Sequence, residues 1–111
     1  MKRGEVWLVD FGQPSGPEQA GKRPAIIMQA DDITAEAATV IVIPLTTNMK
    51  RLAMPSSRLL PAGEAGQDRE SVVLCHQMQV RGKTRLLSRI GELSGDRLTE
   101  VEEHVLNALG I

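Results

Sequence analysis

Cysteine and aromatic residues are scarce in this chain of 111 residues. A single cysteine, Cys75, excludes an internal disulfide framework. With only His76 and His104 beside it, the chain has no cluster of metal ligands at a usual spacing, so we expect neither a metal nor a cofactor. Trp7 and Phe11 are the only aromatics, too few to stack successive bases as OB-fold or cold-shock proteins do.

Long apolar runs are also absent. The longest, residues 39–45, is roughly a third of what a membrane-spanning helix needs. The N-terminus alternates polar and apolar residues where a signal peptide needs a continuous apolar stretch. We therefore expect a soluble, cytoplasmic protein with no membrane segment. Its length and its 41% hydrophobic and 24% charged residues predict one folded domain, residues 1–111.

Charge of one sign is not in excess, because thirteen Lys and Arg stand against fourteen Asp and Glu. This balance argues against a protein that coats nucleic acid through bulk electrostatics. The distribution is uneven: residues 1–90 carry twelve basic and nine acidic side chains, whereas residues 91–111 carry one basic and five acidic ones. Two interpretations remain open for the basic body: a localised polyanion site in its loops, and scattered solvated charges.

Short strands and one terminal helix are what the residue pattern predicts. Residues 39–45 form a β-branched run typical of a central, buried strand. The density of Gly and Pro over residues 12–21 predicts a long exposed loop. The other expected strands are 5–11, 23–29, 57–60, 71–77 and 89–93, with loops over 46–55 and 61–66.

Two helical segments complete the expectation. Residues 31–38 suit one or two helical turns opened by Asp31 or Asp32. The terminal helix carries an apolar stripe, is capped by Ser94 or Asp96 and stops at Gly110. Its stripe consists of Leu98, Val101, Val105 and Leu109. The predicted class is α+β but mainly β, as a strongly bent antiparallel sheet or partly open barrel with the helix on one side.

Cys75 and His76 invite a nucleophile and base interpretation. Neighbours on a strand point to opposite faces, so we expect a core cysteine instead. His104 lies on the acidic terminal helix, where a solvated imidazole is ordinary. A two-histidine nuclease would require His76 and His104 to meet across the fold.

The loop over residues 16–24 holds a carboxylate, Glu18, five residues before a guanidinium, Arg23. Arg can grip a phosphate bidentately, and a nearby carboxylate can take a proton from an attacking hydroxyl. A salt bridge within the loop explains the same two residues, so spacing alone leaves both interpretations open.

Collinear motifs along the chain go further. The segment GPEQAGKRP at 16–24, preceded by KRGEVWLVDF at 2–11, resembles the MazF/PemK family of toxin endoribonucleases. The likeness continues through PLTTNMK at 44–50, ESVVLCHQMQV at 70–80 and RIGELS at 89–94. Nearly the whole chain is covered, in order and with plausible spacing.

This resemblance implies a small SH3-like, strongly curved antiparallel β-barrel with a C-terminal helix, assembled as a homodimer. It implies the toxin of a type II toxin–antitoxin system, an endoribonuclease that cuts single-stranded RNA at short sequences without a metal. Attack by the ribose 2′-hydroxyl leaves a 2′,3′-cyclic phosphate and a 5′-hydroxyl. A MazE-like antitoxin with a disordered, acidic tail is the implied protein partner.

Carried over residue by residue, the resemblance assigns Arg23 to stabilising the phosphorane and protonating the leaving 5′-oxygen. Thr46 hydrogen-bonds a nonbridging oxygen, and Glu18 corresponds to the glutamate proposed as general base, a role that is less uniform in the family. Gln77 holds a base or the backbone near the scissile step. Four further residues line the RNA path: Gln19, Lys22, Asn48 and Lys50.

One departure and several alternatives accompany this assignment. Many members have serine where this chain has Pro17, so a hydroxyl is missing and the loop is stiffer. Without the other motifs, Thr46 is explained as the cap of a turn and Gln77 as a partner of backbone groups. Two rival functions remain at this point: a toxin of the same fold that poisons DNA gyrase without cutting RNA, and a non-catalytic SH3-like interaction module.

Overall fold

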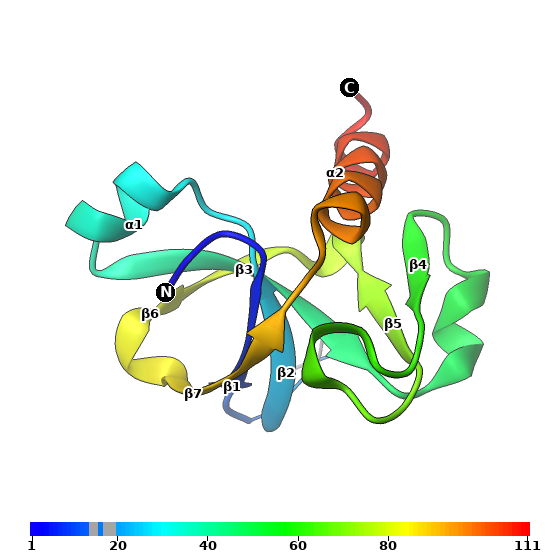
Figure 1. Cartoon of the computed structure of the whole chain (residues 1–111), viewed down its shortest axis with the longest axis horizontal. Coiled ribbons are helices and arrows are strands. Elements are labelled where there is room, and N and C mark those ends of the chain that lie inside the picture. The colour runs from blue at the N-terminus through cyan, green and yellow to red at the C-terminus, as the bar shows by residue number, and fades with distance from the viewer. Residues whose placement is uncertain (14–15, 17–19) are drawn as a thin grey trace.

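The computed structural model describes residues 1–13, 16 and 20–111. Its main feature is a strongly curved antiparallel sheet of seven strands with a C-terminal helix against it (Figure 1). The strands are β1 (Glu5–Asp10), β2 (Lys22–Ile27), β3 (Thr39–Thr46), β4 (Ser57–Leu60), β5 (Ser71–Leu74), β6 (Gln79–Gly82) and β7 (Leu86–Glu92). Their order is β4-β5-β3-β2-β1-β7, with β6 also paired to β3.

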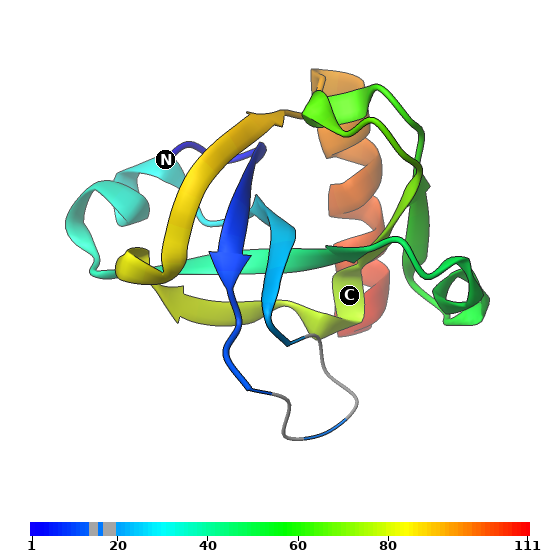
Figure 2. The same ribbon diagram turned by 90° about the horizontal axis from the view of Figure 1, so that it is seen from below.

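Strand β3 is central, as predicted, because it pairs with three other strands along its length. Residues 39–42 pair with β6, Leu45 and Thr46 pair with β5, and β2 borders residues 42–44. These changes bend the sheet, which wraps around its own interior when seen from below (Figure 2). Since β4 and β7 end the strand order among the described residues, the predicted α+β class and partly open, curved barrel are confirmed.

Two apolar clusters lie on the two faces of the sheet at β2 and β3, because successive residues of these strands belong to different clusters. One surrounds Val9, Phe11 and Val42. The other surrounds Ile26, Ile43 and Val73 and is covered by the helix α2 (Gly95–Leu109). The apolar stripe predicted on this helix makes the contact through Val101, with Leu98 and Val105 beside it, whereas Leu109 at its last turn stays exposed.

The helix ends test the predicted caps. Ser94 is the N-cap of α2, since its hydroxyl accepts a hydrogen bond from Arg97 N, and Gly110 ends the helix in the left-handed conformation. The cap predicted for α1 (Asp31–Glu36) was wrong, because Ala30 is its N-cap. The carboxylates point elsewhere: Asp31 accepts from Arg3 N at 2.7 Å and Asp32 from Ile33 N at 3.0 Å.

Several predicted boundaries also differ. The strand predicted over residues 71–77 ends at Leu74, because Cys75–Gln77 turn as the 3₁₀ segment η3. The loop predicted over 46–55 contains a second 3₁₀ turn, η1 (Met49–Ala53). Strand β6 was not predicted, and β7 begins three residues earlier than expected. Shorter 3₁₀ turns lie at η2 (Glu64–Gly66) and η4 (Lys83–Arg85).

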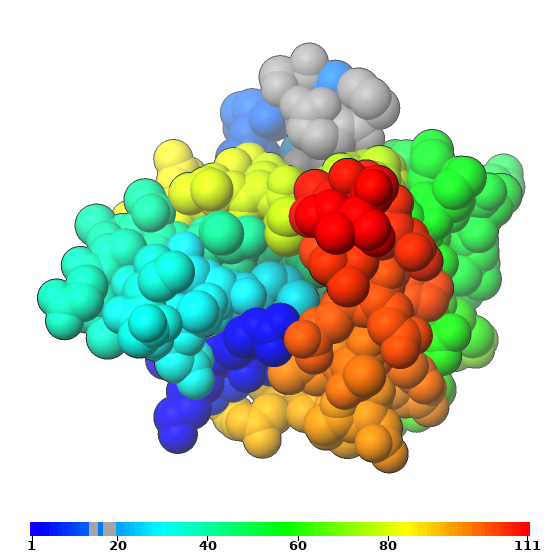
Figure 3. All heavy atoms as spheres, turned by 90° about the horizontal axis from the view of Figure 1, so that it is seen from above, coloured from blue at the N-terminus to red at the C-terminus, as the bar shows by residue number. Residues whose placement is uncertain are grey.

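The acidic helix α2 meets basic residues of the body. Arg58 Nη2 lies 2.7 Å from Glu100 Oε2, and Arg3 Nη2 lies 3.1 Å from Glu102 Oε2. Hydrogen bonds from Arg97 and from Arg58 lower the pKa of the Glu100 carboxyl below its usual value. Figure 3 shows the N-terminal segment beside this helix. Ion pairs between the acidic helix and the basic body therefore help to hold α2 in place.

Close backbone packing makes Gly91 sensitive to substitution. A Cβ at this residue would lie 2.4 Å from Ala65 O, which belongs to a backbone turn that cannot move away as a flexible side chain does. We expect Gly91→Ala to lower the free energy of unfolding by about 1–3 kcal/mol, the usual cost of overpacking. Gly95→Ala is the matched control, because nothing lies within 4 Å of its Cβ. Equal urea midpoints for the two variants would contradict this prediction.

Candidate active site

A small pocket lies where β2 begins, β3 ends and β5 begins. Its volume is about 50 Å³. Among the residues predicted to act in catalysis, Arg23 and Thr46 both line it. The full lining consists of Arg23, Pro24, Leu45, Thr46, Thr47, Gln67 and Ser71.

Local backbone structure places Arg23 at the mouth of this pocket. Gly21 has φ +71°, and hydrogen bonds of 2.7 Å and 2.8 Å join it to Gly12 and Phe11, which closes the base of the loop. Arg23 precedes Pro24, which favours extended backbone at Arg23. Its Nε donates to Ala20 O at 3.2 Å. No described carboxylate lies within 4.0 Å of Arg23, so its terminal nitrogens remain available to an anion.

Thr46 faces the same pocket from the end of β3. Ala25 of β2 pairs with Pro44 of β3, and the two strands are antiparallel. Arg23, two residues before Ala25, therefore lies at the same level of the sheet as Thr46, two residues after Pro44. Thr46 is 8% exposed. Its Oγ1 accepts a hydrogen bond from Asn48 N at 3.2 Å. Thr46 therefore does cap a turn, but because the oxygen is the acceptor, the hydroxyl proton remains free to reach a bound oxygen.

A guanidinium and a buried hydroxyl at one small pocket can hold a phosphoryl group and stabilise negative charge that grows on it. The profile of the family described as "PemK-like, MazF-like toxin of type II toxin-antitoxin system" matches residues 2–109. The chain belongs to this family. A curated relative, Endoribonuclease MazF2 of Mycobacterium bovis, is 34% identical over 100% of this chain and 98% of its own length.

Solved structures agree with the fold of this MazF-family toxin. MazF from Deinococcus radiodurans has a TM-score of 0.84 at 24% identity and covers 100% of this chain and 97% of its own. A mycobacterial endoribonuclease in complex with its cognate antitoxin has a TM-score of 0.82 at 21% identity and covers 100% and 96%. At these identities the likeness shows the fold, which is the one that the sequence motifs implied.

The residues predicted to bind RNA fall into three groups in this MazF-family toxin. Lys22, Asn48 and Lys50 are exposed at the start of β2 and around η1, outside the pocket lining. Gln77 ends η3, is half-buried and does not line the pocket either. Glu18, Gln19 and the departure at Pro17 lie outside the described residues. Their predicted roles stay predictions.

Charge around the pocket favours the polyanion interpretation over scattered solvated charges. Arg85 lies 3.6 Å from Asp10, and Arg89 lies 2.8 Å from Glu5, so these cations have carboxylate partners. Within the described part of the chain, no ion pair involves Lys22, Arg23 or Lys50. Cations without a carboxylate partner among the described residues, as these three are, attract polyanions.

The thiol of Cys75 is not a nucleophile here. It is 2% exposed, and burial raises the pKa of this thiol to about 11, which keeps it protonated at neutral pH. The prediction of a core cysteine is confirmed, although its neighbour His76 is exposed because of the turn at η3 and not because of strand alternation. His104 Nδ1 donates to Glu100 O of its own helix at 2.9 Å, and neither histidine lines the pocket.

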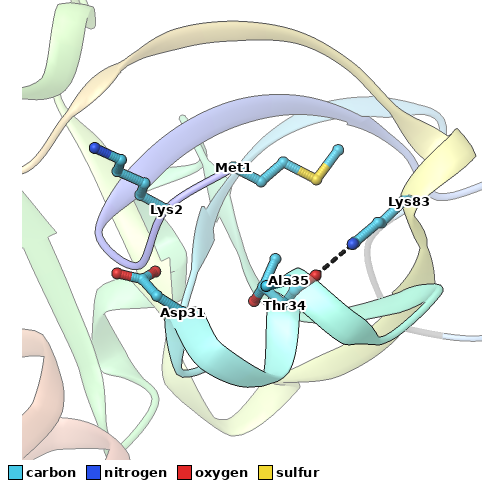
Figure 4. A pocket seen from close by; sticks show the side chains of 6 residues that line it. All are labelled: Met1, Lys2, Asp31, Thr34, Ala35 and Lys83. Atoms are coloured by element: carbon cyan, nitrogen blue, oxygen red, sulfur yellow. Dashed lines mark hydrogen bonds between the residues drawn. The ribbon is translucent and has the colours of Figure 1, made fainter.

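A larger cleft of about 390 Å³ lies between the N-terminus, α1 and η4 (Figure 4). Lys2 and Lys83 border it together with the carboxylate of Asp31, and Lys83 Nζ donates to Thr34 O. Its charges are mixed, and none of the predicted site residues lines it. Size alone therefore does not identify the active site.

Sequence reasoning missed three polar residues of the smaller pocket: Thr47, Gln67 and Ser71. Thr47 directly follows Thr46, and Ser71 is the one polar residue of β5. A serine that opens an otherwise apolar buried strand was the available signal. Gln67 comes from the turn after η2 and left no comparable signal in the sequence.

Proposed function

We propose that this MazF-family toxin is a sequence-specific endoribonuclease that cuts single-stranded RNA in the cytoplasm without a metal ion. The toxin endoribonuclease class follows from the family and from the curated relative at 34% identity. The observation that carries the proposal for this chain is the convergence of Arg23 and Thr46 on one small pocket. No helix of the described residues is long and apolar enough to cross a membrane.

The proposed reaction is an internal displacement at phosphorus. The ribose 2′-oxygen attacks the adjacent phosphate, a bond from phosphorus to the 2′-oxygen forms, and the bond to the 5′-oxygen breaks. The products are a 2′,3′-cyclic phosphate and a 5′-hydroxyl. This chemistry needs a base, an acid and an anion clamp. Among the described residues, no three His, Cys, Asp or Glu side chains gather closely enough to hold a metal ion.

Arg23 and Thr46 supply the clamp in this proposal. The terminal nitrogens of Arg23 stabilise the phosphorane, and Arg23 is the proton donor to the leaving 5′-oxygen. The hydroxyl of Thr46, held by Asn48 N, donates its proton to a nonbridging oxygen. Glu18 takes the proton of the 2′-hydroxyl. Gln19, Lys22, Asn48, Lys50 and Gln77 contact the RNA on either side of the cut.

The test is cleavage of a long defined RNA in excess EDTA, with cut sites mapped by primer extension. We expect cuts at a recurring short sequence, carrying cyclic phosphate ends. Thr46→Ala is expected to lower the cleavage rate by about a hundredfold, because it removes one donor to the developing charge. Thr99→Ala is a matched control on α2, where the hydroxyl donates to Gly95 O and lies far from the pocket lining.

No cutting of varied RNAs by the folded protein would contradict the proposal. A DNA supercoiling assay run with the same preparation would then reveal a gyrase poison of the same fold. Equal rates for Thr46→Ala and the wild type would remove Thr46 from the site while leaving the endoribonuclease activity intact.

Two protein partners belong to the proposal. The cations Lys22, Arg23 and Lys50 would attract the disordered acidic tail of a MazE-like antitoxin, which would cover the RNA path. A homodimer would cover apolar surface that a chain this small leaves exposed. Sedimentation that shows only monomer at micromolar concentration would contradict the dimer. A co-encoded acidic protein that neither binds nor inhibits would contradict the antitoxin.

A further inference from the structure

Ser71 is a buried serine at the candidate active site. It opens β5, is 2% exposed and borders the pocket that Arg23 and Thr46 line. Thr46 pairs with Val72, the next residue of β5, so Ser71 comes beside the turn that follows Thr46. Three neighbouring strands therefore each bring one polar side chain to the same small space.

The hydroxyl of Ser71 has no partner within the described residues. None of the hydrogen bonds found there involves its side chain, whereas Thr46 Oγ1 accepts from Asn48 N and Arg23 Nε donates to Ala20 O. The side-chain atoms that are fully enclosed without a partner among the described residues are Ser57 Oγ and Arg58 Nε, so the hydroxyl of Ser71 is not one of them. Ser71 lines the pocket, and a hydroxyl that lines a pocket and makes no hydrogen bond there can donate one to a ligand.

The size of the pocket limits what that ligand group can be. A volume of about 50 Å³ holds a few water molecules, which suits the oxygens of a phosphoryl group better than a whole nucleobase. The side chains at the pocket agree, because a guanidinium and two hydroxyls are donors to anionic oxygen.

We infer that Ser71 is a further catalytic residue of this toxin and donates its hydroxyl proton to a nonbridging oxygen of the scissile phosphate. The inference rests on the proposed endoribonuclease function. Ser71 and Thr46 then form a pair of hydroxyl donors, while Arg23 neutralises the charge from the mouth of the pocket. A nonbridging oxygen gains charge as the phosphorane forms, so the contact strengthens in the transition state.

Ser71→Ala tests this role, because it removes the hydroxyl and leaves the backbone pairing with Leu60 in place. We expect a loss of about tenfold to a hundredfold in kcat/KM for a short RNA with one cleavage site, at an unchanged Tm. Ser71→Cys keeps the size of the side chain but donates weakly, so it should show the same loss and serves if the alanine variant folds poorly.

Ser57→Ala is the matched control. Ser57 also opens its strand and has no hydrogen-bond partner for its Oγ, but Ser57 lies at the opposite end of the β4–β5 pair, across from Leu74, and does not line the pocket. This variant should cut RNA at the wild-type rate. A loss at Ser71 alone then reports contact with RNA and not the general cost of a missing buried hydroxyl.

Phosphorothioate substrates separate a contact with the phosphate from a structural effect. Sulfur in place of one nonbridging oxygen is a poor acceptor, so the wild type should cut one of the two diastereomers about tenfold more slowly than the normal RNA. Ser71→Ala should cut this diastereomer and the normal RNA at equal rates, because the variant already lacks the contact that sulfur weakens. The comparison is a double-mutant cycle between the side chain and the phosphate oxygen. Thr46→Ala, measured alongside, identifies the oxygen that Thr46 holds.

Two results would overturn the inference while leaving the proposed function intact. The first is wild-type cleavage by folded Ser71→Ala. The second is an unchanged penalty for both diastereomers in Ser71→Ala, which would assign its loss of rate to packing. By contrast, a wild-type protein that cuts none of the RNAs would reject the proposed function itself, and the role of Ser71 with it.

Discussion

Arg23→Ala is expected to lower the rate of RNA cleavage by about 10³-fold or more, the largest effect of any single substitution in this toxin. The reason is that, among the described residues, Arg23 alone brings a positive charge to the lining of the pocket. Hydroxyls such as that of Thr46 can share a proton with the phosphorane but cannot neutralise its charge. Multiple-turnover cleavage of a short RNA with one site, compared with wild type at the same temperature, measures the effect.

Two variants show whether charge or geometry is lost. Arg23→Lys keeps the charge but lacks the planar fork, so it should recover only part of the rate. Lys2→Ala removes the same charge at the other cleft and should cut RNA like the wild type. If Arg23→Ala lost less than tenfold in rate while folded, the pocket would not be the site of the chemistry.

The central strand and the terminal helix could be predicted because their patterns are local. The β-branched run of β3 and the spacing of Leu98, Val101 and Val105 each identify one buried face. Strand β6 has no such pattern, since its four residues are half-buried or exposed. It forms a strand because it pairs with β3, some forty residues away in the chain. The local residue pattern of β6 does not predict this long-range pairing.

Site residues could be predicted where they belong to a sequence motif of the family. Arg23 and Thr46 were found through segments of the chain that resemble a family, and the structure brings both to one pocket. Ser71 was missed because its significance depends on two facts of the folded state, its burial and its place in the lining of the pocket. A sequence shows the hydroxyl but not what surrounds it.

Glu5 opens β1 and is buried although it carries a carboxyl group, since it is only 7% exposed. Its Oε1 accepts hydrogen bonds from Lys2 N at 2.8 Å and Trp7 Nε1 at 3.1 Å, and its Oε2 lies 2.8 Å from Arg89 Nε. Trp7 and Arg89 lie on β1 and β7, the first and last strands of the fold, and Lys2 comes shortly before β1.

Glu5 is therefore expected to make the fold sensitive to acid. Burial alone would raise the pKa of this carboxyl, but the hydrogen bonds from Arg89, Trp7 and Lys2 lower it from 4.5 to about 2. The folded state thus binds this proton less readily than the unfolded state. The stabilisation from Glu5 is present above pH 4.5 and is lost as the pH falls towards 2, up to about 3 kcal/mol in total.

Urea unfolding of the wild type and Glu5→Gln between pH 7 and pH 2.5 measures this contribution. Glutamine keeps an acceptor for Trp7 but loses the ion pair with Arg89, so the wild type should be the more stable protein at pH 7. The difference should shrink as the pH falls below 5, because the wild-type carboxyl is then protonated in the unfolded state. Glu103→Gln, at an exposed carboxyl of α2, should follow the wild type throughout.

A constant difference between wild type and Glu5→Gln across this range would show that the carboxyl contributes through packing and not through its charge. A stability difference that shrinks with falling pH would locate the acid-sensitive contact where β1 pairs with β7. Trp7 and Arg89, which bind the Glu5 carboxylate, lie on these two strands. Strand β1 also borders β2, which carries Arg23. Acid is therefore expected to loosen the sheet next to the strand that carries Arg23.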